Sequence, residues 1–132
     1  MARVMLVDDV GGRVDLTIRD VEPERPGPGE VRYRVHAVGL NRSDIMYIEG
    51  QHYAPTELPS RVASEACGIV DEVGPGVTEF APGDRVSSIP NINPKYYVGG
   101  EYAITPTDYL ARWPDGVPAE EACAFWMQYV TA

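Results

Sequence analysis

Few side chains in this sequence combine a reactive type with a spacing that supports chemistry by itself. Cys67 and Cys123 are the two cysteines, and each lies in an apolar run far from the other. This arrangement predicts two buried, reduced thiols and no disulfide framework. His36 and His52 have no carboxylate or second ligand nearby in the sequence, which favours surface or packing roles. No Gly-x-Gly-x-x-Gly motif occurs, so the sequence contains no phosphate turn of the kind that binds dinucleotides.

Short strands joined by tight turns are expected to position any site that the chain forms. The 132 residues include 13 Gly and 12 Pro, and 44% are hydrophobic, which is typical of many turns between short strands. Apolar runs and alternation predict strands at residues 3–8, 14–19, 30–38, 66–73, 84–89, 100–105 and 109–112. We therefore predict a β-rich (α+β) fold, either a barrel or a sandwich.

The strand predicted at residues 30–38 has the clearest alternation in the chain. Its apolar face is expected to carry Val31, Tyr33, Val35 and Ala37, and its polar face the residues between them. Together with two later strands, this face is predicted to supply the core. The expected core residues are Val31, Tyr33, Val35, Ile69, Val73 and Val86.

One convincing helix is expected, from Pro118 to the end, after a shorter helix or turn at residues 41–50. Glu120 and Glu121 lie in the first turn of the later helix, as the helix dipole favours. Its apolar character continues to Ala132 without a C-cap, whereas a domain boundary is usually polar. We therefore expect residues 1–117 to form one domain. Residues 118–132 are expected to begin a linker helix to a further domain that this sequence lacks.

Charge and hydropathy limit the classes of partner. The chain has 20 acidic and 11 basic side chains, a formal net charge of −9, which argues against binding to nucleic acid or to a membrane surface. It has no basic-then-apolar signal segment and no apolar run of membrane-spanning length, so a cytoplasmic protein is expected. The apolar and aromatic helix is expected to leave surface in water, which predicts a homo-oligomer.

An ordered series of motifs resembles the N-terminal half of medium-chain dehydrogenases/reductases, whose catalytic domain is a GroES-like β-barrel. The resemblance covers nearly the whole chain. It implies a partly open barrel followed by a helix that leads into a Rossmann domain. The motifs are Pro28-Gly29-Glu30-Val31, Val38-Gly39-Leu40-Asn41-Arg42-Ser43-Asp44, Glu65-Ala66-Cys67-Gly68, Val73-Gly74-Pro75-Gly76, Pro82-Gly83-Asp84-Arg85-Val86, Gly100-Glu101-Tyr102-Ala103 and Trp113-Pro114.

The chain departs from the zinc alcohol dehydrogenases of that superfamily at two positions. Those enzymes hold a catalytic metal with a Cys at the position of Asn41 and a His at the position of Ser64, directly before Glu65. An amide and a hydroxyl are poor zinc ligands beside a thiolate and an imidazole. The lobe of four closely spaced Cys is also missing. The sequence therefore resembles the zinc-free quinone-oxidoreductase and enoyl-reductase branches, and we predict no metal.

The resemblance nominates Asn41 and Tyr53 as catalytic residues. An amide can hold a carbonyl oxygen or the nicotinamide, and a phenol can donate to the enolate that follows hydride addition. The alternatives are a helix cap for Asn41 and a packing role for Tyr53, which stands one residue farther from Gly50 than the family pattern implies. Asp44 is expected near the substrate or as a cap, and Thr131 near the carboxamide of the cofactor.

The resemblance implies the substrate-side domain of an NAD(P)H-dependent oxidoreductase that transfers hydride to a quinone, enone or similar conjugated carbonyl. NADPH is favoured over NADH, and most cofactor contacts are expected from the absent domain, so the chain alone is expected to be inactive. Two alternatives stay open. One is a free-standing GroES-like binding or assembly module without redox chemistry, and the other is a zinc alcohol dehydrogenase domain with displaced ligands.

Overall fold

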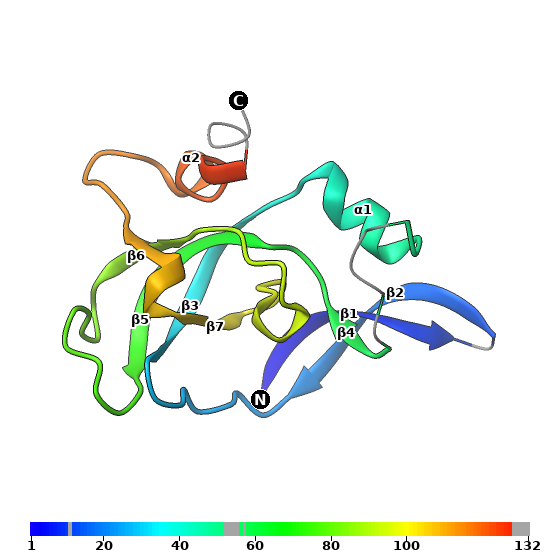
Figure 1. Ribbon diagram of the computed structural model, residues 1–132, viewed down its shortest axis with the longest axis horizontal. Coiled ribbons are helices and arrows are strands. Elements are labelled where there is room, and N and C mark those ends of the chain that lie inside the picture. Colours follow the sequence, from blue (N-terminus) through cyan, green and yellow to red (C-terminus); the bar gives the residue numbers. More distant parts are fainter. Residues whose placement is uncertain (11, 52–55, 57, 128–132) are drawn as a thin grey trace.

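The computed structural model describes residues 1–10, 12–51, 56 and 58–127. This part of the chain folds as two antiparallel sheets with short helices on one side (Figure 1). The three-stranded sheet has the order β2-β1-β4, and the five-stranded sheet has the order β7-β3-β5-β6-β8. The five-stranded sheet curls into a half-barrel and leaves β7 and β8 at opposite edges. The predicted β-rich, partly open barrel is confirmed.

The observed elements agree with the predicted strands to within a few residues, apart from a two-residue strand that no pattern indicated. The strands are β1 Ala2–Val10, β2 Arg13–Val21, β3 Glu30–Gly39, β4 Ser60–Arg61, β5 Glu65–Val73, β6 Arg85–Ser88, β7 Tyr102–Pro106 and β8 Leu110–Arg112. The helices are α1 Arg42–Ile48 and α2 Ala119–Ala122, with 3-10 turns η1 Pro94–Tyr96 and η2 Thr107–Tyr109.

The segment before β7 joins the two sheets. The Met5 N–H donates to the Gly99 carbonyl at 3.1 Å, and the Glu101 N–H donates to the Arg3 carbonyl at 2.9 Å. An isolated bridge between Val4 and Gly100 lies between these two bonds. These contacts connect β1 to the segment before β7, and a smaller apolar cluster of Val7, Tyr47, Val62 and Tyr97 lies apart from the main core.

Most of the predicted core residues lie in the main core. Val31, Tyr33 and Val86 have no exposed surface, and Val35 and Val73 pack against them partly buried. Ile69 is the exception, and its prediction is wrong. The β3–β5 register pairs Tyr33 with Val70, so Val70 shares the core face while Ile69 lies on the opposite face of the sheet, beside a shallow surface hollow.

A β-bulge in β3 interrupts the alternation that the sequence suggests. Val35 pairs with Gly68 and Ala37 pairs with Cys67, which leaves His36 without a partner in β5. The extra residue exchanges the two faces of the strand. Val38 therefore packs on the main core, and Ala37 packs on a separate cluster of Cys67, Trp113, Ala122 and Cys123. The prediction that Ala37 shares a face with Val31 is wrong. The bulge instead places Ala37 against the cluster that contains Ala122 of α2.

Both cysteines lie in that second cluster, as buried free thiols, which confirms their predicted state. The Cys67 Sγ donates to the Ala119 carbonyl at 3.3 Å. Burial raises the pKa of the Cys67 thiol to about 12 and also raises the pKa of Cys123. Both thiols therefore stay protonated at neutral pH and serve as small packing groups.

The single helix predicted from Pro118 onward is wrong over residues 123–125. The helix α2 ends at Ala122, Cys123 and Ala124 form a turn, and Phe125 is a bend before helical geometry resumes at Trp126 and Met127. The physical reason is a competing acceptor, because Glu65 takes the N–H groups of Trp126 and Met127 that a continuous helix would direct to its own carbonyls. Among the described residues, none of the helices has the length and apolarity needed to cross a membrane.

Candidate functional site

A buried carboxylate connects three separate segments at the end of the half-barrel near α1 and α2. Glu65 opens β5 and has no exposed surface. Its Oε1 accepts the Trp126 N–H at 2.5 Å and the Met127 N–H at 3.0 Å, and its Oε2 accepts Asn41 Nδ2 at 3.2 Å. No Lys or Arg side chain in the described part of the chain pairs with Glu65. Three N–H donors therefore replace the water that burial removes from this carboxylate.

Asn41 and Asp44 lie together where β3 passes into α1. Asn41 is the N-cap of α1, and the Asp44 carboxylate accepts the Asn41 backbone N–H at 2.8 Å in a capping box. Asp44 therefore holds the backbone of Asn41, and Glu65 holds its side-chain amide. An amide NH₂ group has two donor hydrogens, and Glu65 accepts one of them.

A cavity of about 220 Å³ lies beside this junction. Its lining comes from α1, from the residue before β5, from the segment between β6 and β7, and from Met127. The lining residues are Ser43, Asp44, Ser64, Pro90, Asn91, Ile92, Tyr97 and Met127. Four hydroxyl or amide side chains and one carboxylate thus share a small cavity with apolar walls. This mixture is what a site for a small polar organic molecule requires.

Ser64 is the residue of this cavity whose polar group the protein leaves unsatisfied. The residue is 8% exposed, and its Oγ has no hydrogen-bond partner. In the part of the chain that the structure describes, no other buried side-chain nitrogen or oxygen is in this condition. Ser64 drew attention in the sequence as a poor zinc ligand, and only the burial and contacts of its hydroxyl identify it as a candidate binding group.

The four site residues expected from sequence have different outcomes. Asn41 and Asp44 are brought together, and Asp44 both caps α1 and lines the cavity. Tyr53 and Thr131 lie outside the described residues, so their proposed roles stay predictions. Glu65 was known from sequence only as part of a family motif. Its function as the common acceptor for Asn41 and for the segment at Trp126 and Met127 depends on contacts between residues far apart in the chain.

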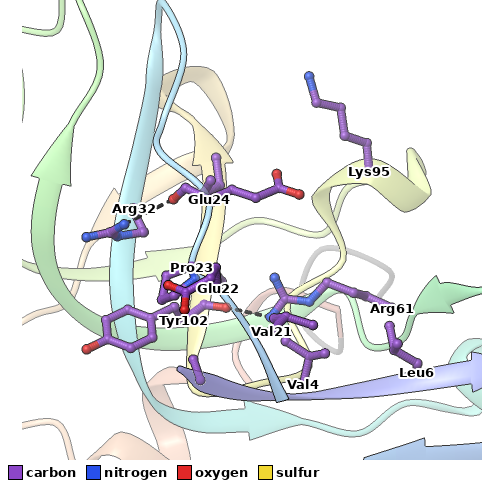
Figure 2. A pocket seen from close by; sticks show the side chains of 13 residues that line it. Val4, Leu6, Val21, Glu22, Pro23, Glu24, Arg32, Arg61, Lys95 and Tyr102 are labelled. Carbon is purple, nitrogen blue, oxygen red and sulfur yellow. Dashed lines mark hydrogen bonds between the residues drawn. The ribbon is translucent and has the colours of Figure 1, made fainter. Parts of the chain in front are cut away.

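A second cavity, of about 210 Å³, lies between β1, β7 and the loop after β2 (Figure 2). Arg61, Arg32 and Lys95 line it, which at first suggests an anion site. Arg61, however, directs Nε and Nη2 to the carbonyls of Gly99 and Tyr102, and burial lowers its pKa. Lys95 Nζ lies 3.5 Å from the Glu30 carboxylate. These cations have protein acceptors, so we assign them to holding β4 and the segment before β7 in place.

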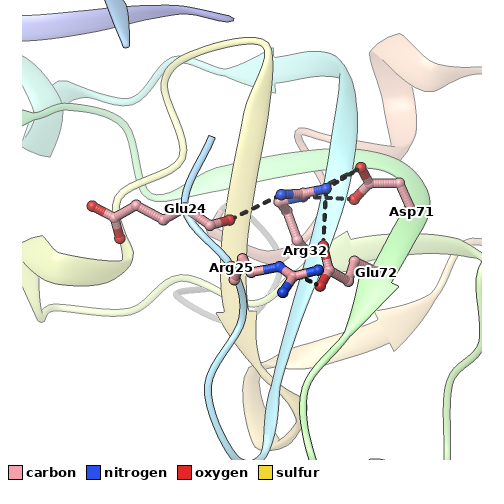
Figure 3. A network of polar contacts seen from close by, with 5 residues as sticks. All are labelled: Glu24, Arg25, Arg32, Asp71 and Glu72. Atoms are coloured by element: carbon pink, nitrogen blue, oxygen red, sulfur yellow. Dashed lines mark hydrogen bonds and ion pairs between the residues drawn. The ribbon is translucent and has the colours of Figure 1, made fainter. Parts of the chain in front are cut away.

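The third cation, Arg32, is bound in a polar network on the outside of the sheet (Figure 3). Its Nη2 lies 2.8 Å from Asp71 and 3.1 Å from Glu72, and its Nη1 donates to the Glu24 carbonyl at 3.1 Å. Arg25 adds a contact of 3.3 Å to Glu72. The network attaches the loop after β2 to β3 and β5. The cavity beside Ser64 is therefore the better candidate for a functional site.

The donor set at the candidate site does not favour a metal ion. Among residues 1–10, 12–51, 56 and 58–127, no three His, Cys, Asp or Glu side chains are grouped so that they could hold one. Asn41 and Ser64 stand at the two positions discussed above, and one of them is already bonded to Glu65. The absence of zinc from this protein remains a prediction.

The curled five-stranded sheet has the partly open barrel form that the sequence resemblance implied. The model of the alcohol dehydrogenase GroES-like domain matches residues 27–131, and the chain belongs to this family. A quinone oxidoreductase of Pseudomonas aeruginosa is 38% identical over 131 residues, which cover 99% of this chain and 39% of that protein.

Solved structures agree with this assignment. A quinone oxidoreductase of Pseudomonas syringae superimposes with a TM-score of 0.83 at 37% identity, over 99% of this chain and 39% of that one. The Escherichia coli quinone oxidoreductase complexed with NADPH superimposes with a TM-score of 0.81 at 28% identity, over the same shares of the two chains. The present chain thus spans about two-fifths of the length of these relatives.

Proposed function

We propose that this chain is the substrate-side domain of a zinc-independent, NAD(P)H-dependent oxidoreductase that reduces a quinone, an enone or a similar conjugated carbonyl. The observation that carries the proposal is the cavity lined by Ser64 and by Asp44, which is bonded to Asn41. Metal-dependent relatives need His and Cys where this chain has Ser64 and Asn41. Similarity to quinone oxidoreductases over 99% of the chain supports it. The relative complexed with NADPH favours NADPH over NADH.

The bound cofactor would supply the hydride, and the residues of this chain would hold the acceptor. We assign the second N–H of the Asn41 amide to a carbonyl oxygen of the acceptor or to the nicotinamide amide, with Glu65 and Asp44 fixing its orientation. Pro90, Tyr97 and Met127 would exclude water from one side of the bound molecule. By resemblance, Tyr53 would donate a proton to the reduced acceptor and Thr131 would contact the carboxamide.

The surface charge is consistent with a small-molecule substrate and with a cofactor that is bound partly by another domain. A net charge of −9 disfavours the cofactor phosphates, so we propose that a nucleotide-binding domain contributes the phosphate contacts. The same charge argues against nucleic acid and anionic lipid as partners. We further propose a cytoplasmic location.

A chimera tests the proposed function. Residues 1–132 would be joined to the part of the Pseudomonas aeruginosa relative that follows its matching segment. The chimera is expected to oxidise NADPH only when a quinone is present, whereas the 132-residue chain alone shows no turnover. Asn41→Ala in the chimera should lower kcat/KM about tenfold, because one hydrogen bond to the acceptor is worth about 1.4 kcal/mol.

Asn93→Ala is the matched control, because the Asn93 side chain caps η1 and does not line the cavity. Its kcat/KM should stay within about twofold of the parent chimera. A folded chimera that binds NADPH but never oxidises it with quinones or enones would contradict the proposal. That result would favour the free-standing binding module.

We also propose that the chain self-associates through the surface near Phe125. Phe125 is 51% exposed, and Leu40, just before α1, and Ile45, within α1, are 80% and 57% exposed. The helices α1 and α2 lie on the same side of the sheets (Figure 1). Sedimentation velocity at micromolar concentration should show a dimer or larger species that Phe125→Ser converts to monomer. Ile18→Ser, at a 70% exposed residue on β2, should leave the dimer intact. A monomeric wild type would contradict this proposal.

A further inference from the structure

The hydroxyl of Ser64 is a buried polar group for which the fold supplies no partner. Ser88, in β6, shows the usual arrangement of a buried serine. Its Oγ accepts the Ala66 N–H at 2.8 Å and donates to the Ala66 carbonyl at 3.3 Å. An unsatisfied buried hydroxyl destabilises a protein, so folding alone gives no reason for a serine at this position.

The position of Ser64 indicates what that reason is. Ser64 lines the cavity of about 220 Å³ and directly precedes Glu65, whose contacts hold the cavity wall at Met127. The backbone of Ser64 is therefore fixed, while rotation about χ1 can turn Oγ toward the cavity. A ligand atom in the cavity that accepts or donates a hydrogen bond would satisfy this oxygen.

The size and charge of the cavity restrict the ligand. A cavity of about 150 Å³ is enough for benzene in a protein interior, so about 220 Å³ accommodates one six-membered ring with small substituents. Tyr97, Pro90 and Met127 offer apolar contact to such a ring. Asp44 contributes the one carboxylate among the lining residues, which disfavours an anionic ligand.

We infer that this cavity binds a neutral, single-ring carbonyl compound whose oxygen accepts a hydrogen bond from Ser64 Oγ. The inference rests on the proposed function for the carbonyl class, and the cavity then selects single-ring acceptors over larger polycyclic quinones. Ser64 is in this view a specificity-determining residue, and its hydrogen bond forms without any hydride transfer.

Binding can therefore be measured on the 132-residue chain without nucleotide. A ¹⁵N-labelled sample titrated with cyclohex-2-enone should show saturable shifts of the backbone amides at Ser64 and Ile92. Cyclohexene, which has the ring but no oxygen, should bind at least about tenfold more weakly. Mass spectrometry excludes a covalent adduct, which the protonated state of Cys67 and Cys123 already disfavours.

Variants separate binding from folding. Ser64→Ala should weaken enone binding about tenfold while leaving the urea midpoint unchanged or higher, because it removes an unsatisfied group. Ser64→Thr keeps the hydroxyl and should retain most of the affinity. Ser88→Ala is the matched control and should behave in the opposite way, lowering the urea midpoint without changing the affinity of the folded fraction.

Two results would overturn the inference. One is equal enone affinity in Ser64→Ala and wild type, and the other is a wild-type chain that shows no saturable shifts near Ser64. Either result can occur with a chimera that still reduces quinones, in which case the proposed function stands and the role of Ser64 fails. Ser64-dependent enone binding with an inactive chimera would instead count against the redox function alone.

Discussion

Glu65→Ala is expected to lower the free energy of unfolding by about 4 kcal/mol, a large share of the 5–15 kcal/mol that stabilises an ordinary domain. The change removes one acceptor and leaves three N–H donors, those of Asn41, Trp126 and Met127, without partners. Each buried donor left unsatisfied costs about 1–3 kcal/mol, and the two backbone donors are half-buried, so water recovers part of the loss.

Glu65→Gln is the matched control for this prediction. Its amide oxygen can still accept the N–H groups of Trp126 and Met127, while its NH₂ group opposes Asn41 Nδ2 unless the Asn41 amide turns over. The loss should therefore be about 1–2 kcal/mol, from one bond instead of three. Urea unfolding gives both values, and amide exchange at Trp126 and Met127 should accelerate selectively in Glu65→Ala. Equal stability of Glu65→Ala and wild type would show that the carboxylate does not connect these segments.

The second large effect is expected at Gly39, where β3 passes beneath the turn after α2. A Cβ on Gly39 would lie 2.2 Å from the Cys123 carbonyl oxygen and 3.3 Å from Glu65 Oε2. The φ angle of Gly39 lies outside the left-handed region, so the backbone accepts alanine and the cost is purely steric. Because the obstructing atom belongs to the main chain, the turn at Cys123 must move away. Gly39→Ala is expected to cost about 3 kcal/mol.

Gly27→Ala provides the comparison. The nearest atom to its Cβ would be Glu30 Oε1 at 3.1 Å, the end of a flexible side chain. This substitution should cost about 1 kcal/mol or less, as measured by thermal or urea unfolding. Displacement of the turn in Gly39→Ala should also weaken enone binding, since Met127 lines the cavity. A Gly39→Ala chain as stable as Gly27→Ala would mean that α2 is not seated against β3 as described.

Much of the fold could be predicted because it depends on local pattern. Alternation at residues 30–38, apolar runs, and Gly and Pro turns identified most of the strands. The two errors within the sheet come from two separate register shifts between β3 and β5. The shift between Arg32 and Tyr33 places Val70 on the core face in place of Ile69, and the bulge at His36 places Val38 there in place of Ala37. Register is a property of two strands together, and one strand's pattern does not contain it.

The candidate site was predictable to a smaller extent. Motif resemblance led to Asn41 and Asp44, and the structure brings these two together. It could not reveal that Ser64 has an unsatisfied hydroxyl, since satisfaction depends on which groups from other segments come within hydrogen-bond distance. The predicted helix from Pro118 failed for a related reason. Local propensity favoured continuation, and a carboxylate some sixty positions earlier in the chain captured two of its N–H groups.

The sequence by itself determined the class of fold, the burial of the two thiols, the acidic surface and the lack of a phosphate turn, because these follow from composition and short-range pattern. Tertiary structure alone decided where the ligand cavity lies and which groups face it. That cavity is made by residues from α1, by Ser64 before β5, by the segment between β6 and β7, and by Met127. Asp44 and Glu65 hold the groups around the cavity with hydrogen bonds, whereas the Ser64 hydroxyl has no hydrogen-bond partner. Which donor meets which acceptor is decided only when the chain folds.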